Sequence, residues 1–581
     1  MASAVELLLA AAPLIITAVL LVGLLWPATR AMPIAWVAAL AVGFFVWNNA
    51  PVWLAGASIV GVITALEILF IVFGALVLLY TLMQAGAFDR INEGFAAVSD
   101  DRRVQIVLLA FFLATFIEGA AGFGTPAAVV APLLLALGFP ALAAVIAALI
   151  GHIIAVTYGA VGTPIIVGIE SPLDVYEAEI AEGGFTVVGY SQEVAAWAAT
   201  YHALVGFLMP LFAVSMVVYF FGEERSLKPA FSVAPLCLFA GIVFAIPYWA
   251  SAWFITAEFP SLIGAMVGGA ITVAVLQAGY LLPDDEWDFP PREEWPDYWV
   301  GTIEPGGEEV DAAIDDTESM SLLKAWAPYI ILVILLVVTR VNDTISGFIT
   351  DPELGVTLDT AIGEFGIGVL LQWNDILGTG LADSISWVNV PGFWLFLSAV
   401  IAIPLFGMSG QEVKDAWAEA GQKLISPLIA LVFVIAMVQV MLQSGNYEAA
   451  ALEESMIEVL AIATANATGA IYPGIAALIG ALGAAMTGSN TVSNITFAGF
   501  QFTAAQELGL PTQILVGAQA VGGAIGNLVA IHNVVAALAT VGLVGQEGRV
   551  MRLNLIPLFY YAVLVGFWAL LFSYVLFPGI F

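Results

Sequence analysis

The sequence predicts an all-α polytopic membrane protein with about 12 transmembrane helices and two re-entrant hairpins, arranged as two repeats of inverted topology. Composition is the first indication: 61% of residues are hydrophobic, 10% are charged and the mean hydropathy is +1.02. These values exclude a soluble globular protein. The second indication is that two apolar stretches contain the polar and glycine-rich runs FIEGAAGFGTP, near residue 115, and GAAMTGSNTVSN, near residue 483.

Apolar stretches of about 20 residues define the predicted spans. They lie at residues 4–26, 32–54, 56–84, 140–169, 194–221, 232–255, 258–282, 323–341, 389–407, 424–444, 511–540 and 553–578. The first is interpreted as a retained span, because it has no basic region before it and is longer than the apolar core of a signal peptide. Residues 104–138 and 465–500 are each too long for one span and too interrupted for a straight helix.

The basic residues favour two hairpins that enter and leave on the same side, because Lys and Arg collect on the cytoplasmic side of membrane proteins. With both segments re-entrant and the N-terminus outside, twelve of the thirteen basic residues fall inside and Arg340 alone falls outside. If both segments crossed the membrane, only seven would be inside. The twelve are Arg30, Arg90, Arg102, Arg103, Arg225, Lys228, Arg292, Lys324, Lys414, Lys423, Arg549 and Arg552.

The same assignment produces two inverted repeats, which is the architecture of many secondary transporters. Each contains three spans, an amphipathic stretch along the membrane surface (88–98 and 452–463), a hairpin, a broken span and a final span. The first repeat covers 1–231, with hairpin 104–138 and broken helix 140–169. Residues 232–322 are two linking spans and an acidic cytoplasmic loop, and 323–581 form the second repeat, with hairpin 465–500 and broken helix 511–540.

The net charge of −33 is unusual for a membrane protein. Residues 283–320 contain fourteen Asp or Glu and the single basic residue Arg292. We interpret this loop as a solvated segment and the overall acidity as the mark of a halophilic source. The chain has one cysteine, Cys237, so an intrachain disulfide is excluded. No metal-ligand cluster is recognised, and neither a cofactor, an enzymatic activity nor a nucleic-acid partner is expected.

The hairpins and broken helices are predicted to converge on one binding site, since helix breaks at membrane depth are tolerated only inside the protein or beside a wet cavity. Residues 104–169 and 465–540 contain no Lys or Arg, so an anion there would be held by helix N-termini, amides and hydroxyls. Close packing of the glycines is the alternative interpretation. The predicted substrate-binding residues are Gly119, Gly122, Gly124, Thr125, Thr157, Tyr158, Gly159, Ser489, Asn490, Thr491, Ser493, Asn494, Gly522, Gly523 and Asn527.

Glu118 is the predicted proton acceptor, because an ionisable side chain at membrane depth is costly and marks a functional site. A structural brace for the hairpin tip is the alternative. His152 and Glu67 are secondary candidates for a proton relay, although an isolated histidine such as His152, His202 or His532 is more often a satisfied core residue.

These motifs resemble a known family. EGAAGFGTPAAVVAPLLLALGF, followed by GHIIAVTYGAVGTPI and by the late GAAMTGSNTVSNITFAGFQ, is similar to the signature regions of the L-lactate permease family, and the resemblance covers nearly the whole chain. It implies proton-coupled uptake of lactate, with glycolate as a related substrate. The triplet Ser489, Asn490, Thr491 also resembles the hairpin tips of sodium-coupled carboxylate symporters of the wider ion-transporter superfamily. The first half has Gly124, Thr125, Pro126 instead, and residues 527–533 depart from the permease pattern.

The sequence therefore predicts a multi-pass protein of the cell membrane that takes up L-lactate, or a related 2-hydroxy monocarboxylate such as glycolate or D-lactate, with a proton. A sodium-coupled symporter is the alternative, with oxygen ligands from Asn490, Thr491 and Asn494. An anion channel and a membrane scaffold remain as other classes. A homodimer is left open.

Overall fold

The computed structural model describes residues 3–122, 124–303, 320–543 and 545–581. Within these ranges, twelve helices are long and apolar enough to cross a membrane, or thirteen if the bent pair Ala141–Gly151 and Ile153–Ile166 is one span. The all-α prediction for the membrane part is thus confirmed. The re-entrant hairpins and the inverted repeats stay predictions.

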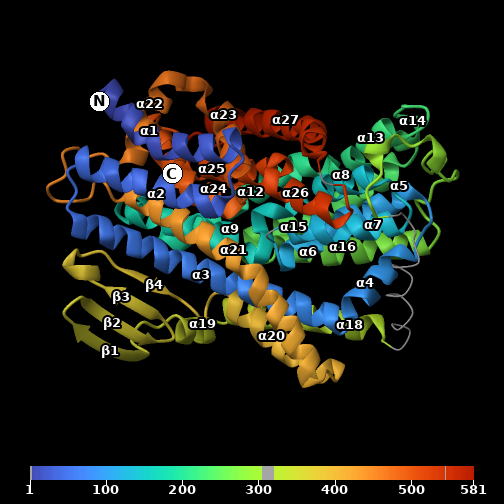
Figure 1. Ribbon diagram of the computed structural model, residues 1–581, viewed down its shortest axis with the longest axis horizontal. Helices are drawn as coiled ribbons and strands as arrows, with labels where there is room; N and C mark the ends of the chain where they lie inside the picture. Colours follow the sequence, from blue (N-terminus) through green and yellow to red (C-terminus); the bar gives the residue numbers. More distant parts are fainter. Residues whose placement is uncertain (1–2, 123, 304–319, 544) are drawn as a thin grey trace.

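The first half and the linking spans are helical throughout (Figure 1). The helices are α1 (Ala4–Ala18), α2 (Ala28–Phe45), α3 (Pro51–Gln84), α4 (Ala87–Ala96), α5 (Arg102–Gln105), α6 (Ala114–Ala120), α7 (Thr125–Ala136), α8 (Ala141–Gly151), α9 (Gly159–Ile166), α10 (Glu170–Leu173), α11 (Glu177–Glu182), α12 (Val187–Val205), α13 (Met209–Phe221), α14 (Lys228–Ser232), α15 (Ala234–Phe254) and α16 (Pro260–Gln277). The π-helical segments Val19–Gly23 and Ile106–Leu113 extend α1 and join α5 to α6.

The second half contains helices and a small sheet. The helices are α18 (Leu322–Val341), α19 (Asp343–Ile349), α20 (Pro391–Phe406), α21 (Gly410–Leu442), α22 (Met456–Thr468), α23 (Tyr472–Thr487), α24 (Asn490–Glu507), α25 (Thr512–Gly526), α26 (Ile531–Thr540) and α27 (Glu547–Leu571). The strands are β1 (Gly355–Thr360), β2 (Gly363–Gly368), β3 (Leu371–Asn374) and β4 (Asp383–Ile385).

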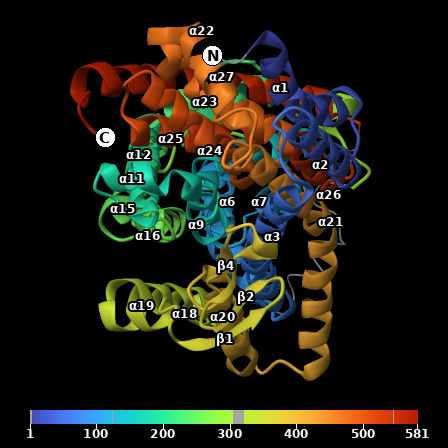
Figure 2. The same cartoon turned by 90° about the vertical axis from the view of Figure 1, so that its left-hand side faces the viewer.

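The sheet is a feature that the sequence analysis did not anticipate. Its four strands pair antiparallel in the order β1-β2-β3-β4, with Leu358 opposite Phe365 and Phe365 opposite Trp373. Alternating side chains and the tight turn between β1 and β2 favour strands here. The sheet lies to one side of the helical body, next to α3, α18, α19 and α20 (Figure 2).

Several predicted span boundaries move in the structure, and two of the changes have a clear local cause. Residues 51–54 belong to α3 and not to the preceding span, because Asn48 has a positive φ of 58° and Pro51 is the first residue of α3. Helix α21 begins at Gly410, well before residue 424, since Ser409 and Glu412 form a capping box that starts the helix in its polar part. The amphipathic stretches are the helices α4 and α22.

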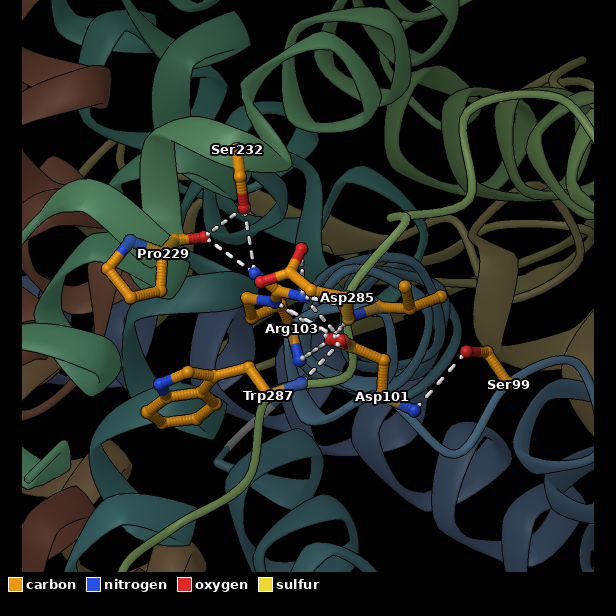
Figure 3. A network of polar contacts seen from close by, with 8 residues as sticks. Ser99, Asp101, Arg103, Pro229, Ser232, Asp285 and Trp287 are labelled. Carbon is orange, nitrogen blue, oxygen red and sulfur yellow. Dashed lines mark hydrogen bonds and ion pairs between the residues drawn. The ribbon is translucent and has the colours of Figure 1, made fainter.

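A buried ion-pair network joins three loops at the end of the molecule where α4, α5 and α14 lie (Figures 1 and 3). Arg103 is fully buried and its Nη2 lies 2.6 Å from Asp101 Oδ2. The guanidinium also donates to Ser232 Oγ at 2.8 Å and to the carbonyl oxygen of Asp285 at 2.5 Å, and the backbone amide of Trp287 donates to Asp101. A buried charge needs partners on every side, and here they come from segments far apart in sequence.

This network corrects the prediction of a wholly solvated acidic loop. Phe289 and Trp299 are 9% and 7% exposed, and aromatic contacts connect Trp287, Phe289 and Phe139. The loop is therefore packed on the helices up to residue 303, because its aromatic residues bury apolar area that its acidic residues cannot. Residues 304–319 of the predicted loop lie outside the described residues.

Candidate functional site

The first polar interruption is the connection between α6 and α7. Gly122 and Gly124 have φ values of 62° and 77°, a backbone conformation that favours glycine. The hydroxyl of Thr125 donates to the carbonyl oxygen of Gly122 at 2.7 Å and closes this turn. Residue 123 of the predicted site region lies outside the described residues. The residues that flank the predicted hairpin 104–138 lie together, with the Arg102 guanidinium 5.6 Å from the ring centre of Phe139.

The second interruption is the connection between α23 and α24. Gly488 ends α23 with a φ of 72°, and Ser489 is the N-cap of α24, where its Oγ accepts from the amide of Val492 at 3.4 Å. Helices α23 and α24 run back along each other: Tyr472 donates to Gln501 Oε1 at 2.6 Å, and Ser493 Oγ donates to the carbonyl oxygen of Gly480 at 2.8 Å. Helix α24 therefore begins at the connection with α23, which is the tip of this helical pair.

The two broken helices follow these tips along the chain. Helix α8 ends at Gly151, and the chain bends by 45° before Ile153–Ile166, where a 3-10 segment (Ile153–Tyr158) leads into α9. Within α9, Ala160, Val161 and Gly162 have left-handed backbone angles. Helix α25 ends at Gly526, and Asn527–Val529 form a 3-10 turn before α26.

All four interruptions meet around one small cavity of about 50 Å³, enough space for a few water-sized groups. Its lining residues are Glu118, Gly122, Gly124, Ala127, Leu149, His152, Ile153, Val156, Gly159, Ala160, Pro164, Gly488, Ser489, Asn490, Thr491, Asn527 and Asn533. Residues of both polar interruptions thus line one cavity. Among these described lining residues there is no Lys or Arg.

Hydrogen bonds cross between the halves at this cavity. Asn490 Nδ2 donates to the carbonyl oxygen of Val156 at 3.4 Å, and Asn494 Nδ2 donates to that of Pro164 at 2.9 Å. These carbonyl groups are available because the helix around them is broken. The second tip therefore braces the first broken helix. Asn533, on α26, donates to the carbonyl oxygen of Gly488 at 3.3 Å and to Asn527 Oδ1 at 3.1 Å.

Glu118 and His152 form the ionisable part of the cavity wall. The carboxylate Oε2 lies 4.0 Å from His152 Nε2, and the residues are 4% and 5% exposed. His152 Nδ1 lies 2.6 Å from the carbonyl oxygen of Ala148. A carbonyl oxygen only accepts, so Nδ1 carries the proton and Nε2 of the neutral ring is an acceptor that faces Glu118. At 4.0 Å the two side chains are within ion-pair range but beyond direct hydrogen-bond distance.

Two amide oxygens at the second tip are buried without a hydrogen-bond partner among the described residues. They are Asn490 Oδ1 and Asn494 Oδ1; the Nδ2 groups of the same side chains donate to backbone carbonyls. A buried acceptor without a partner is costly. Asn490 also lines the cavity, and its Oδ1 lies against Gly523, 2.0 Å from the position that a Cβ atom would take there.

Nine residues named from the sequence line the cavity: Glu118, Gly122, Gly124, His152, Gly159, Ser489, Asn490, Thr491 and Asn527. The others lie behind its wall. Thr125 closes its own turn, Thr157 Oγ1 lies 2.7 Å from His202 Nε2, Tyr158 donates to the carbonyl oxygen of Ala195, and Ser493 bonds to Gly480. Gly119, Gly522 and Gly523 lie against Ser261, Ala477 and Asn490, where a Cβ atom would come within 3 Å of its neighbour. A binding role for each of these residues stays a prediction.

The sequence analysis did not include Ala160, Pro164, Gly488 and Asn533 among the site residues, although all four line the cavity. Pro164 and Ala160 are in the YGAVGTP run and Gly488 precedes the Ser489 triplet. The sequence analysis therefore named residues next to them as site residues. His202 is a satisfied core residue, between Thr157 and the hydroxyl of Tyr561. Glu67, the other candidate for a relay, lies on α3 outside the cavity lining.

A second, larger cavity of about 840 Å³ shares Gly488, Ser489 and Asn533 with the small one. Its wall includes Trp26–Ala28, at the turn between α1 and α2, and Glu547–Gly548, at the start of α27. The small cavity therefore adjoins a wide vestibule past the second tip.

A multi-pass bundle whose helix breaks surround a small internal cavity with a vestibule on one side defines an integral membrane transporter of the cell membrane. The comparison with known families agrees: the family model described as L-lactate permease matches residues 6–576. The chain belongs to the L-lactate permease family.

Relatives of known name extend over most of the chain. It is 28% identical to the putative L-lactate permease of Haemophilus influenzae, over 94% of each chain. It is 26% identical to the L-lactate permease of Bacillus subtilis, over 81% of this chain and 79% of the relative. It is also 26% identical to the glycolate permease GlcA of Escherichia coli, over 86% and 84%. These relatives are named as transporters of small 2-hydroxy monocarboxylates.

Proposed function

We propose that this protein takes up L-lactate, or a related 2-hydroxy monocarboxylate such as glycolate or D-lactate, together with a proton. The observation that carries the proposal is the pairing of Glu118 and His152 in the wall of a cavity whose described lining residues include no basic side chain. A proton bound at this pair would balance the negative charge of the substrate in the cavity. One proton moved with one monovalent anion makes the transport step electroneutral.

The carboxylate of the substrate would lie between the starts of α24 and α7. The first amides of a helix have no partner within the helix and carry a partial positive charge. Ser489, Asn490 and Thr491 place the start of α24 at the cavity, and Gly124 places the start of α7 there. The 2-hydroxyl group would then donate to Asn490 Oδ1, which lacks a partner. The cavity volume supports a substrate with few heavy atoms.

The vestibule suggests which side this conformation faces. Its rim contains the turns that precede Arg30 and Arg549, both predicted to be cytoplasmic. We therefore assign the structure to an inward-facing state, from which substrate and proton leave past Gly488 and Asn533. Release at a cytoplasm less acidic than the outside would follow from loss of the proton held by Glu118 and His152.

The test is accumulation of labelled L-lactate by proteoliposomes with an imposed pH gradient, acidic outside. Concentrative uptake that a protonophore abolishes supports the proposal, and chromatography should recover the lactate unchanged. Counterflow with labelled glycolate, D-lactate and pyruvate then ranks the substrates. Uptake that only equilibrates the label across the membrane would indicate a channel instead.

Sodium coupling is a second candidate, favoured by the unpartnered oxygens of Asn490 and Asn494. Hard cations prefer such oxygen ligands. Uptake measured at fixed pH with sodium replaced by N-methylglucamine separates the two candidates. Unchanged accumulation without sodium removes this alternative, whereas its loss would replace the proton as the coupling ion.

A further inference from the structure

Four carboxyl groups gather where the sheet meets the helical body, away from the central cavity. They belong to Glu67 on α3, Glu170 on α10, Asp174 in the 3-10 turn Asp174–Tyr176, and Asp383 on β4; we call them the sheet-side carboxyl cluster. Two contacts hold the sheet there. The amide of Ser386 donates to Glu67 Oε1 at 3.1 Å, and the hydroxyl of Thr64 lies 3.1 Å from Asp383 Oδ2.

A buried amide is connected to the same cluster through two hydroxyl groups. Thr64 Oγ1 lies 3.3 Å from Ser171 Oγ, which in turn accepts from Gln439 Nε2 at 3.4 Å. Gln439, on α21, is 2% exposed and its Oε1 has no hydrogen-bond partner. A buried acceptor among carboxylates needs a donor. A proton on a neighbouring carboxyl group, or on a water between them, would provide one.

The surroundings of the cluster are negative. Glu177 on α11 lies near Asp174, and Glu258 lies near Glu170. Arg340, near the end of α18, is a basic residue beside Glu258, but its Nη2 pairs with Glu258 at 2.6 Å and its Nη1 donates to Asn389. Serine hydroxyls are the remaining polar neighbours: Ser191 on α12 donates to Glu170 Oε1 at 2.8 Å. The cluster carboxylates therefore face more negative than positive charge.

Protons are the natural counter-charge at such a position. Burial raises the pKa of Asp383 to about 8, and the negative charges of Glu67 and Asp174 contribute to the rise. Burial likewise raises the pKa of Glu170 to about 8. Asp174 is exposed and the other three groups are half-buried, so protons from the solvent can reach the cluster.

We propose that the sheet-side carboxyl cluster is a second proton-binding site, separate from Glu118, whose shared protons hold the four-stranded sheet on α3. Deprotonation places several negative charges across this contact and releases the sheet. The inference does not depend on which substrate is transported. Because Glu170 follows α9 by four residues, the state of the cluster also affects the segment that leads to the cavity.

The direction of the pH dependence follows from the carboxyl groups. The docked sheet binds a proton at Asp383 up to a pH of about 8, whereas a solvated aspartate loses it near 3.8. The released state therefore binds fewer protons between these values. Docking is strongest at low pH and weakens as the pH rises through this window.

The experiment measures the distance between the sheet and α3 in the full-length protein. Nitroxide labels on Val52→Cys and Thr357→Cys, both at exposed positions, report this distance by pulsed electron paramagnetic resonance. The natural Cys237 is fully buried and is replaced by alanine in a control. We expect one narrow distance at pH 5.5 and a broad distribution at pH 8.5.

Matched variants decide the origin of the change. Asp383→Asn should keep the narrow distance at both pH values, whereas Asp359→Asn, on the exposed strand β1, should behave as the wild type. A wild-type distance that does not change with pH overturns the proposal. A change that follows added sodium or calcium at constant pH also overturns it, in favour of a metal cation.

A disulfide provides the second test, which stands even if Asp383→Asn folds poorly. A Cβ atom on Gly56 would lie 3.0 Å from Thr379 Oγ1, so Gly56→Cys and Thr379→Cys place two thiols within bonding range across the contact. Disulfide formation should be at least fivefold more complete at pH 5.5 than at pH 8.5 when both samples are oxidised to equilibrium in the same redox buffer ratio. Equal yields would contradict release.

Discussion

The two polar tips face the same cavity but differ in what their side chains do. The first tip presents a carboxyl group, with Glu118 4.0 Å from His152, while the hydroxyl of Thr125 is engaged by its own turn. The second tip presents amides and hydroxyls, and Asn490 and Asn494 use their Nδ2 groups to hold the first broken helix. The two tips occupy corresponding places in the predicted repeats, but the first contributes an ionisable group and the second contributes neutral polar groups.

This difference suggests a separation of proton and substrate chemistry. The ionisable groups lie on the first half of the chain, and the polar neutral groups come mainly from the second. Hydrogen bonds from the second tip to the first broken helix connect the ionisable groups of the first half with the neutral polar groups of the second half. If the division is correct, substitutions at the first tip should change coupling, and those at the second tip should change affinity and stability.

The largest effect is expected for Glu118→Gln. Glutamine keeps the size of the side chain but cannot take up a proton, so pH-driven accumulation of lactate should fall by more than 100-fold while exchange of lactate across the membrane persists. Uptake and counterflow in the same proteoliposomes measure the two activities. Glu118→Asp is the control and should retain pH-dependent uptake. Full gradient-driven uptake by Glu118→Gln would remove this residue from the mechanism.

The next effect is expected for Gly488→Ala. The left-handed backbone there costs an L-residue about 1 to 2 kcal/mol, and the new Cβ atom would overlap the ring of His532, 1.4 Å from its Nε2. We expect at least tenfold weaker lactate binding and a lower Tm, measured by titration and thermal unfolding. Gly421→Ala, with open space around its Cβ position, should change neither. Adding His532→Ala should restore part of the loss, and no recovery would contradict the overlap as its cause.

Asn490→Ala and Asn494→Ala test the second tip itself. Each removes a donor to a carbonyl group of the first broken helix, and a buried polar group left without its partner costs about 1 to 3 kcal/mol. Lactate affinity should therefore fall by about 5- to 150-fold. Asn494→Ala should also lower the Tm, since its bond to Pro164 is the shorter of the two. Asn446→Ala, at an exposed position, is the control; wild-type affinity in both test variants would place the site elsewhere.

The smallest effect is expected for Ser489→Ala. Its Oγ caps α24 through a long bond of 3.4 Å, and loss of an N-cap costs about 0.5 to 2 kcal/mol. We expect about 2- to 30-fold weaker binding with coupling unchanged. Ser409→Ala removes the N-cap of α21, far from the cavity lining, and should lower stability without changing affinity. Loss of proton-coupled uptake in the Ser489→Ala variant would contradict the proposed separation of proton and substrate chemistry between the two tips.

Apolar length was sufficient to predict an all-α membrane protein with about 12 spans, and the helix-breaking and polar residues named nine of the residues that line the cavity. They did not predict the sheet, because strands of three to six residues produce no apolar window of span length. They also misplaced residues 283–303 in solvent, since the acidic residues there outnumber the aromatic ones that pack.

The sequence by itself determined that the chain lies in a membrane and which residues interrupt its helices. Both depend on short stretches of sequence, because the thickness of the bilayer sets the length of an apolar span and a Gly or Pro residue acts on its own helix. Only the tertiary structure decided which side chains at those interruptions remain free. The Nδ2 groups of Asn490 and Asn494 donate to the carbonyl groups of Val156 and Pro164, more than 300 positions away, and the Oδ1 atoms have no hydrogen-bond partner among the described residues. A hydrogen bond depends on what lies opposite, and that is fixed by packing between distant segments.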